Sequence, residues 1–174
     1  MKTESNKALP LKALMSSMFI LIAIAFLVSL FVFKESMITF ISKKVKEQVG
    51  ETIQKSTAMY VDSAYNFQNN KEGYQITFLE FGATGCSSCR MMEKVMAEVR
   101  SAYPKKIKVK FMNALQPANQ DMMKYFGISA IPTQVLLDAS GKEVFRHTGY
   151  YSYEELDKEF QKIVRDAALG RRFA

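Results

Sequence analysis

The 174-residue chain contains no tryptophan, a single histidine and only two cysteines, Cys86 and Cys89. A secreted scaffold that is held together by disulfides carries more cysteines at wider spacing, so that class of protein is excluded. A structural zinc site needs four ligands. His147 and the two cysteines cannot complete a thiolate and imidazole site without a second chain or carboxylates, and we therefore predict no metal.

The net charge is positive, because 24 Lys and Arg stand against 17 Asp and Glu and give a formal charge of +7. Such a balance suits nucleic acid or an anionic lipid surface. The basic residues are scattered along the chain, however, and neither stacking aromatics nor a nucleic-acid motif accompanies them. We predict that nucleic acid is not a partner.

One long hydrophobic run, residues 13–33, holds three serines and no charged residue. At about 1.5 Å per residue a helix of this length spans about 31 Å, close to the hydrocarbon thickness of about 30 Å. A cleaved signal peptide has a shorter apolar region followed by small residues, which are missing here. We predict an uncleaved, single-pass transmembrane anchor after an N-terminal tail, residues 1–12.

The orientation of this anchor follows less directly from the sequence, because lysines are nearly balanced on its two sides. A short tail, an anchor and a single following domain favour a domain outside the cytoplasm. We therefore predict a membrane protein whose domain lies on the periplasmic side.

Residues 34–60 are polar but periodic, with apolar side chains every three or four positions, as at Ile38, Ile41 and Val45. This pattern predicts an amphipathic helical stalk. Its apolar stripe either packs on the domain or the lipid surface, or forms a coiled-coil seam, for which it is short and irregular. Residues 61–174 then suffice for one compact domain.

This domain alternates between strand and helix patterns. Strands are predicted over residues 75–81, 106–112, 133–137 and 143–147, and helices over residues 87–103, 119–126 and 152–168. Residues 138–141 read as a hairpin turn between the last two strands. The order of strands and helices predicts an α/β domain.

The two cysteines follow the first strand through a short glycine-containing loop, where the next helix begins. The free N–H groups and the positive dipole of a helix N-terminus stabilise a thiolate, so the pKa of Cys86 should fall below the free value of about 8.5. Cys89 lies one turn further along, within disulfide reach but more shielded. We predict that Cys86 attacks and that Cys89 resolves the mixed disulfide.

Two motifs with their spacing resemble the thioredoxin family over roughly residues 62–168. They are Cys-Ser-Ser-Cys at positions 86–89 and Ile-Pro-Thr at positions 131–133. The resemblance implies a thioredoxin-like fold with a mixed central sheet flanked by helices, and a redox-active disulfide between Cys86 and Cys89. It also implies that Pro132 is cis beside the cysteines and that the backbone of Ile131 pairs with a substrate strand.

A carboxyl group lies six residues before the first cysteine, at Glu80. The family commonly has a buried acid at this place, so the resemblance implies that Glu80 relays a proton to Cys89. The chain departs from the usual Trp-Cys-Gly-Pro-Cys loop, since Gly85 precedes Cys86 and two serines separate the cysteines. These departures remove part of the apolar platform that receives substrates, and they change the reduction potential.

The predicted function is a membrane-anchored thiol–disulfide oxidoreductase that reduces disulfides of extracytoplasmic partner proteins. It needs no bound cofactor, because the sulfurs of Cys86 and Cys89 carry both electrons. Membrane-anchored members of the family often serve cytochrome c biogenesis or disulfide repair, so the resemblance implies a membrane thiol transporter as a possible electron donor. Two alternatives stay open, a disulfide oxidase or isomerase and a non-enzymatic thioredoxin-like binding scaffold.

Overall fold

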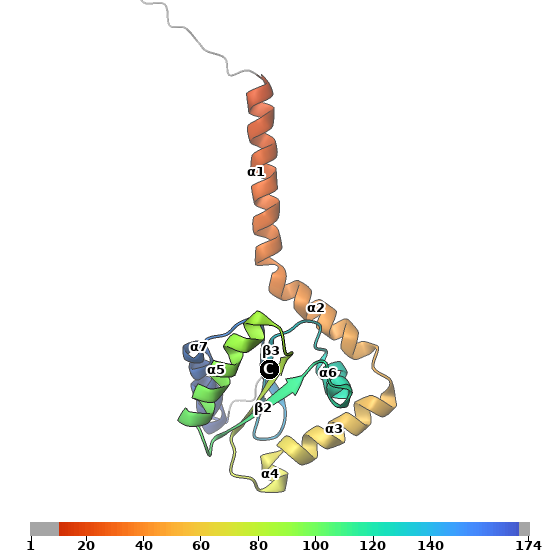
Figure 1. The fold of residues 1–174 in the computed structure, drawn as a ribbon, viewed down its shortest axis with the longest axis vertical. Coiled ribbons are helices and arrows are strands. Elements are labelled where there is room, and N and C mark those ends of the chain that lie inside the picture. The colour runs from red at the N-terminus through yellow and green to blue at the C-terminus, as the bar shows by residue number, and fades with distance from the viewer. Residues whose placement is uncertain (1–10, 171–174) are drawn as a thin grey trace, which may run out of the picture. The chain divides into compact units, whose positions relative to one another are not determined.

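The computed structural model describes residues 11–170. Outside the described part lie residues 1–10 and 171–174 and the side chains at positions 11–14, 16–17, 31 and 34–35. The predicted N-terminal tail therefore lies almost wholly outside it. The chain divides into two compact units, Met1–Phe40 and Ile41–Ala174, each of which can be followed separately in Figure 1.

The first unit contains helix α1, Leu11–Val32, over nearly the same residues as the predicted anchor. Among the residues that the structure describes, no helix is both long enough and apolar enough to cross a membrane. The transmembrane assignment of residues 13–33 therefore stays a prediction, as do the predicted domain boundaries.

The single helix predicted over residues 34–60 is wrong, because the chain forms two helices there, α2, Lys34–Glu47, and α3, Glu51–Tyr65. The break falls at Gly50, whose φ of −57° and ψ of 144° are extended rather than helical. A short helix that was not predicted, α4, Phe67–Asn70, follows. Helix α3 buries Val61 and Tyr65 in the core of the second unit.

A four-stranded sheet forms the centre of the second unit. Its strands are β1, Ile76–Gly82, β2, Ile107–Asn113, β3, Thr133–Asp138, and β4, Glu143–Thr148. They lie in the order β2-β1-β3-β4. Because β1 pairs parallel with β2 and antiparallel with β3, the sheet is mixed, as predicted.

Helices cover both faces of the sheet, which completes the predicted α/β architecture (Figure 1). Besides α3 they are α5, Ser87–Ala102, the 3₁₀ turn η1, Pro117–Asn119, α6, Gln120–Phe126, and α7, Tyr153–Ala168. All three predicted helices of the domain are confirmed to within two residues. The predicted start of the last one is a capping box between Ser152 and Glu155.

Strand β1 separates two hydrophobic clusters and is buried along its whole length. Phe78 packs with residues of α5 and α7 on one face, whereas Leu79 and Phe81 pack with residues of α3 and α6 on the other. Because side chains alternate along a strand, Glu80 and Gly82 belong to the face that α5 covers. This alternation brings Glu80 to the same side of the sheet as the cysteines.

Candidate active site

The site begins where β1 passes through a short loop into α5. Gly85 adopts a φ of +92°, which favours glycine, and Cys86 is the N-cap of α5. The Cys86 Sγ accepts a hydrogen bond from the backbone N–H of Cys89 at 3.2 Å. An oxygen from Ser, Thr, Asn or Asp usually fills this role, and here a sulfur does. The first cysteine therefore lies in the positive field at the start of a helix.

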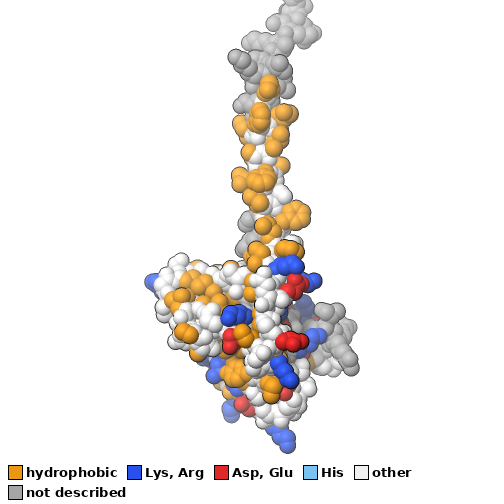
Figure 2. Space-filling view, turned by 90° about the vertical axis from the view of Figure 1, so that its right-hand side faces the viewer, with side chains coloured by type: hydrophobic (Ala, Val, Ile, Leu, Met, Phe, Trp, Pro, Cys, Tyr) orange, Lys and Arg blue, Asp and Glu red, His pale blue; other side chains and the backbone are white. Residues whose placement is uncertain are grey.

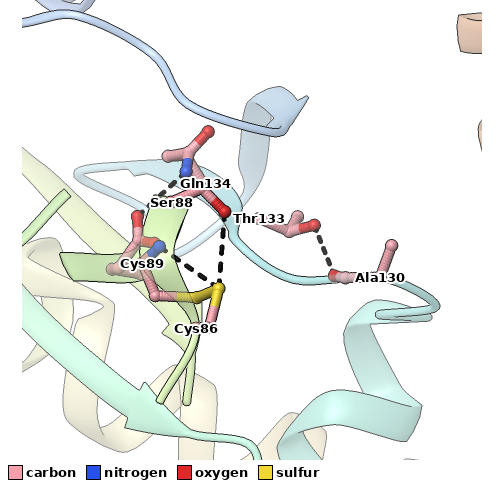
Figure 3. The surroundings of a disulfide bond; sticks show 7 residues. Cys86, Ser88, Cys89, Ala130, Thr133 and Gln134 are labelled. Atoms are coloured by element: carbon pink, nitrogen blue, oxygen red, sulfur yellow. Dashed lines mark hydrogen bonds between the residues drawn. A yellow bond between two sulfur atoms is a disulfide. The ribbon is translucent and has the colours of Figure 1, made fainter. Parts of the chain in front are cut away.

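Cys86 and Cys89 form a disulfide with their Cα atoms 5.2 Å apart. The two cysteine residues differ in exposure, because Cys86 is half-buried whereas Cys89 is only 2% exposed. The Ser88 Oγ lies 3.4 Å from the Cys86 Sγ, and Figure 3 shows both contacts of this sulfur. An incoming group reaches Cys86 first, and Cys89 is shielded behind it.

Cys89 packs directly against β1 at Gly82. A Cβ atom added to this glycine would lie 3.4 Å from the Cys89 Cβ, 3.5 Å from its Sγ and 2.9 Å from Cε2 of Phe111. The absence of a side chain at position 82 therefore allows the second cysteine to approach the strand closely. The sequence contains Gly82, but the position of a glycine in a strand does not by itself predict that Cys89 lies against it.

Glu80 is fully buried on the same face of β1, two residues before Gly82. Its Oε2 accepts a hydrogen bond of 3.1 Å from Nε2 of Gln134 on β3. Burial raises the pKa of Glu80 to about 8, against the smaller opposing effect of the Gln134 hydrogen bond. A carboxyl group with this pKa gains or loses its proton near neutral pH.

The peptide bond between Ile131 and Pro132 is cis, as the resemblance implied. Thr133, directly after it, pairs with Phe81 near the end of β1, so the proline lies at the same end of the sheet as the loop to Cys86. Ile131 is half-buried there. The substrate-binding role of Ile131 and Pro132 stays a prediction.

Hydrogen bonds hold this proline loop from both sides. The Thr133 Oγ1 donates to the Ala130 carbonyl oxygen at 2.8 Å and lies 3.0 Å from the Thr148 Oγ1. The N–H of Gly149, a residue with a φ of +111°, donates to the Pro132 carbonyl oxygen at 2.8 Å. The loop between α6 and β3 is thereby fixed to the end of β4.

No group of three or more His, Cys, Asp or Glu side chains within residues 11–170 is arranged to hold a metal ion. The predicted residues lie on adjoining elements, with Glu80 on β1, Cys86 as the N-cap of α5 and Cys89 in the first turn of that helix. Sequence reasoning missed Gln134, although an amide in the otherwise apolar run of β3 is a signal for a buried polar partner.

These features define a dithiol–disulfide exchange site on an α/β domain. The profile of the thioredoxin-like domain family matches residues 64–163, and the chain belongs to that family. The chain is a thiol–disulfide oxidoreductase, which rests on this match together with the cysteine pair and the relatives described next.

Proteins similar to this chain include several thioredoxins. That of Alicyclobacillus acidocaldarius is 31% identical over 100 residues, which are 58% of this chain and 92% of the relative. That of Listeria monocytogenes is 33% identical over 97 residues, 56% of this chain and 89% of the relative. The crystal structure of the thioredoxin NaTrxh from Nicotiana alata matches with a TM-score of 0.46 and 33% identity, over 55% of this chain and 79% of that one.

Proposed function

We propose that the protein is a membrane-anchored reductase that donates electrons from the Cys86 and Cys89 dithiol to disulfides of extracytoplasmic proteins. The observation that supports it most is the asymmetry of the two sulfurs, one half-buried at the helix start and one buried against β1. In this proposal Cys86 forms the mixed disulfide with the partner. Cys89 then attacks Cys86 and releases the reduced partner.

Glu80 is proposed to accept the proton of the Cys89 thiol before this second attack. Support comes from its complete burial on the α5 side of β1 and from its raised pKa of about 8. The Cys89 thiolate is the nucleophile of the resolving step, so a nearby base speeds that step.

Partner proteins are proposed to bind in an extended conformation beside the loop at Ile131 and Pro132. The backbone of Ile131 then pairs with the partner, as strands pair with an open edge. The hydrogen bonds of Thr133 and Gly149 support this role, because a rigid loop loses little entropy on binding.

The reductase function is tested by insulin reduction with the full chain and by the reduction potential. We expect Cys86→Ser to abolish activity and Ser87→Ala, at an exposed neighbouring position, to keep it. We expect a potential near about −270 mV, whereas a value near about −120 mV would identify an oxidant. Activity that survives Cys86→Ser would contradict the catalytic assignment. Cys89→Ser should trap a mixed disulfide with the natural partner and with an electron donor in the membrane.

Membrane attachment is proposed from the sequence of residues 13–33, which includes positions whose side chains lie outside the described part. Described side chains along α1 such as Phe19, Leu21 and Phe26 are apolar and more than half exposed. Figure 2 shows hydrophobic side chains along this helix. A lipid environment offers such side chains a favourable contact.

This attachment and its orientation have their own test. We expect the full chain to stay with membranes after an alkaline carbonate wash, and its second unit to be digested when protease is added outside the cytoplasmic membrane. Release by the wash contradicts the anchor. Protection from the external protease contradicts the proposed periplasmic side and leaves the redox assignment intact.

A further inference from the structure

Gln134 is a fully buried amide whose position needs an explanation. It lies opposite Glu80 in the pairing of β1 with β3, and both side chains are 0% exposed. The Gln134 Nε2 donates to the Glu80 Oε2, and the remaining oxygen of each side chain has no hydrogen-bond partner within the described residues. Burying a polar atom without a hydrogen-bond partner destabilises the folded protein. A leucine at position 134, like Leu136 on the same face, would bury no unpaired oxygen of its own but would leave the Glu80 carboxyl without the Gln134 hydrogen bond.

The pair lies next to the buried cysteine. Gly82 follows Glu80 on the same face of β1, about 7 Å along the strand, and Cys89 rests on Gly82. The buried carboxyl is therefore a near neighbour of the thiol that must lose a proton in the resolving step. The orientation of the Glu80 carboxyl group sets the distance between its oxygens and this thiol.

We propose that Gln134 is a positioning residue for thiol–disulfide exchange, because its amide holds the Glu80 carboxyl in the orientation that exchanges a proton with Cys89. This inference rests on the proposed role of Glu80. Nothing in it requires Gln134 to touch the substrate or either sulfur.

The Cys86 thiolate attacks the partner's disulfide, so that a Cys86–partner bond forms and one partner sulfur leaves as a thiolate. The Glu80 carboxylate takes the proton of the Cys89 thiol, and the resulting thiolate attacks the Cys86 Sγ. The Cys86–Cys89 bond forms, the mixed disulfide breaks, and the second partner sulfur leaves. Two electrons have passed from the dithiol to the partner, and the partner thiolates are protonated by the solvent.

A neutral amide suits this task because it orients the carboxyl group without adding a charge. Few other titratable groups face Glu80 from the surrounding elements. Cys89 does so from α5, and His147 lies beyond Gln134 on β4, where it stacks on Tyr151 at 4.3 Å. Helix α7 contributes apolar side chains to this face.

The two lysines of β2 lie on the opposite face of the sheet from Glu80. Lys108 pairs with Glu72 and donates to the Ala64 carbonyl oxygen, on the face of the sheet that α3 covers, and Lys110 is exposed on that face. The β2 residue paired with Glu80 is Phe111, which carries no charge. A change in the pH dependence of the resolving step therefore reports on Glu80 and its amide partner.

The decisive variant is Gln134→Met in the full chain, which keeps the length of the side chain and removes the donor. Loss of a hydrogen bond to the ionised carboxylate shifts its protonation to higher pH. We expect the midpoint of the resolving step to rise by about one pH unit and its rate at pH 7 to fall about tenfold. The first attack by Cys86, measured in the Cys89→Ser background, should be unchanged. The matched control Leu136→Met should keep the wild-type midpoint.

Three outcomes separate the possibilities. A wild-type midpoint in Gln134→Met overturns the inference about Gln134. A resolving step that is unchanged in Glu80→Gln overturns the proposed role of Glu80 itself. If Gln134→Met does not fold, nuclear magnetic resonance of the wild-type protein decides, because the Gln134 side-chain amide signal should titrate with the same midpoint as the Glu80 carboxyl. If the Gln134 amide signal does not change as the Glu80 carboxyl titrates, the inference is overturned as well.

Discussion

At the scale of the residue, Glu80 makes stability depend on pH. Burial raises its pKa from 4.5 in a free side chain to about 8 in the folded protein with the disulfide closed. Between these two values the unfolded chain releases this proton and the folded chain keeps it. Rising pH therefore favours the unfolded state until Glu80 ionises in the folded protein as well.

We predict that Glu80→Gln removes this effect. Between pH 4.5 and about 8, the free energy of unfolding of the oxidised wild-type protein should fall relative to the variant by about 1.4 kcal/mol per pH unit. Below this window and above it the difference should be constant. Denaturant unfolding across the pH range measures it, with Glu93→Gln, an exposed carboxylate on α5, as control. Equal slopes for wild-type and Glu80→Gln would contradict the buried-acid assignment.

Ser88 leads to a second prediction at this scale, because its hydroxyl lies 3.4 Å from the Cys86 Sγ. In the reduced protein this hydroxyl is expected to donate to the thiolate. We predict that Ser88→Ala moves thiolate formation at Cys86 up by about 0.5 to 1 pH unit. The pH dependence of alkylation by iodoacetamide measures the midpoint, and Ser87→Ala should leave it in place. A shared midpoint for both variants would show that the Ser88 hydroxyl has no influence on this sulfur.

At the scale of the element, local patterns predicted most of the domain. The alternation in β2 and the capping box of α7 are signals carried by neighbouring residues, so both elements lie within one or two residues of the predicted bounds. The break at Gly50 was missed because the apolar spacing continues through it. The pairing of Glu80 with Gln134 was missed because it depends on the register of β1 and β3, which no local pattern contains.

Contact between two elements explains why the residue that ends α6 is a glycine. Gly127 ends α6 with a φ of +62°, and an added Cβ would collide with the Ser42 carbonyl oxygen of α2 and lie 2.8 Å from Cγ of Lys46. Ser42 is buried, and the Lys46 Nζ pairs with Glu143 at 3.3 Å. Residues 41–47 of α2, which belong to the second unit, thus pack on the rest of that unit around this glycine.

We predict that Gly127→Ala loosens this packing. The left-handed backbone alone costs about 1–2 kcal/mol for a residue with a side chain, and the collision adds to it. Hydrogen exchange of the amides at positions 41–47 should become faster, and the midpoint of denaturant unfolding should fall. Gly73→Ala, where nothing lies within 4 Å of an added Cβ, is the matched control. Unchanged exchange at positions 41–47 would contradict the contact.

At the scale of the whole molecule, both hydrophobic clusters and every candidate site residue belong to the unit Ile41–Ala174. We therefore predict that residues 34–174, which keep α2 intact, fold alone and reduce insulin at the rate of the full chain. The same fragment with Cys86→Ser controls for background reduction. A fragment that folds but has lost its activity would show that residues 1–33 contribute to catalysis.

Because Cys89 packs closely on Gly82, the reactivity of its thiol also reports how often α5 separates from β1. In the reduced protein, a thiol-labelling reagent should modify Cys86 at once but reach Cys89 only when α5 lifts from β1. The doubly labelled fraction, followed by mass spectrometry, then counts these rare openings. Their frequency in the living cell would become measurable without any engineered probe.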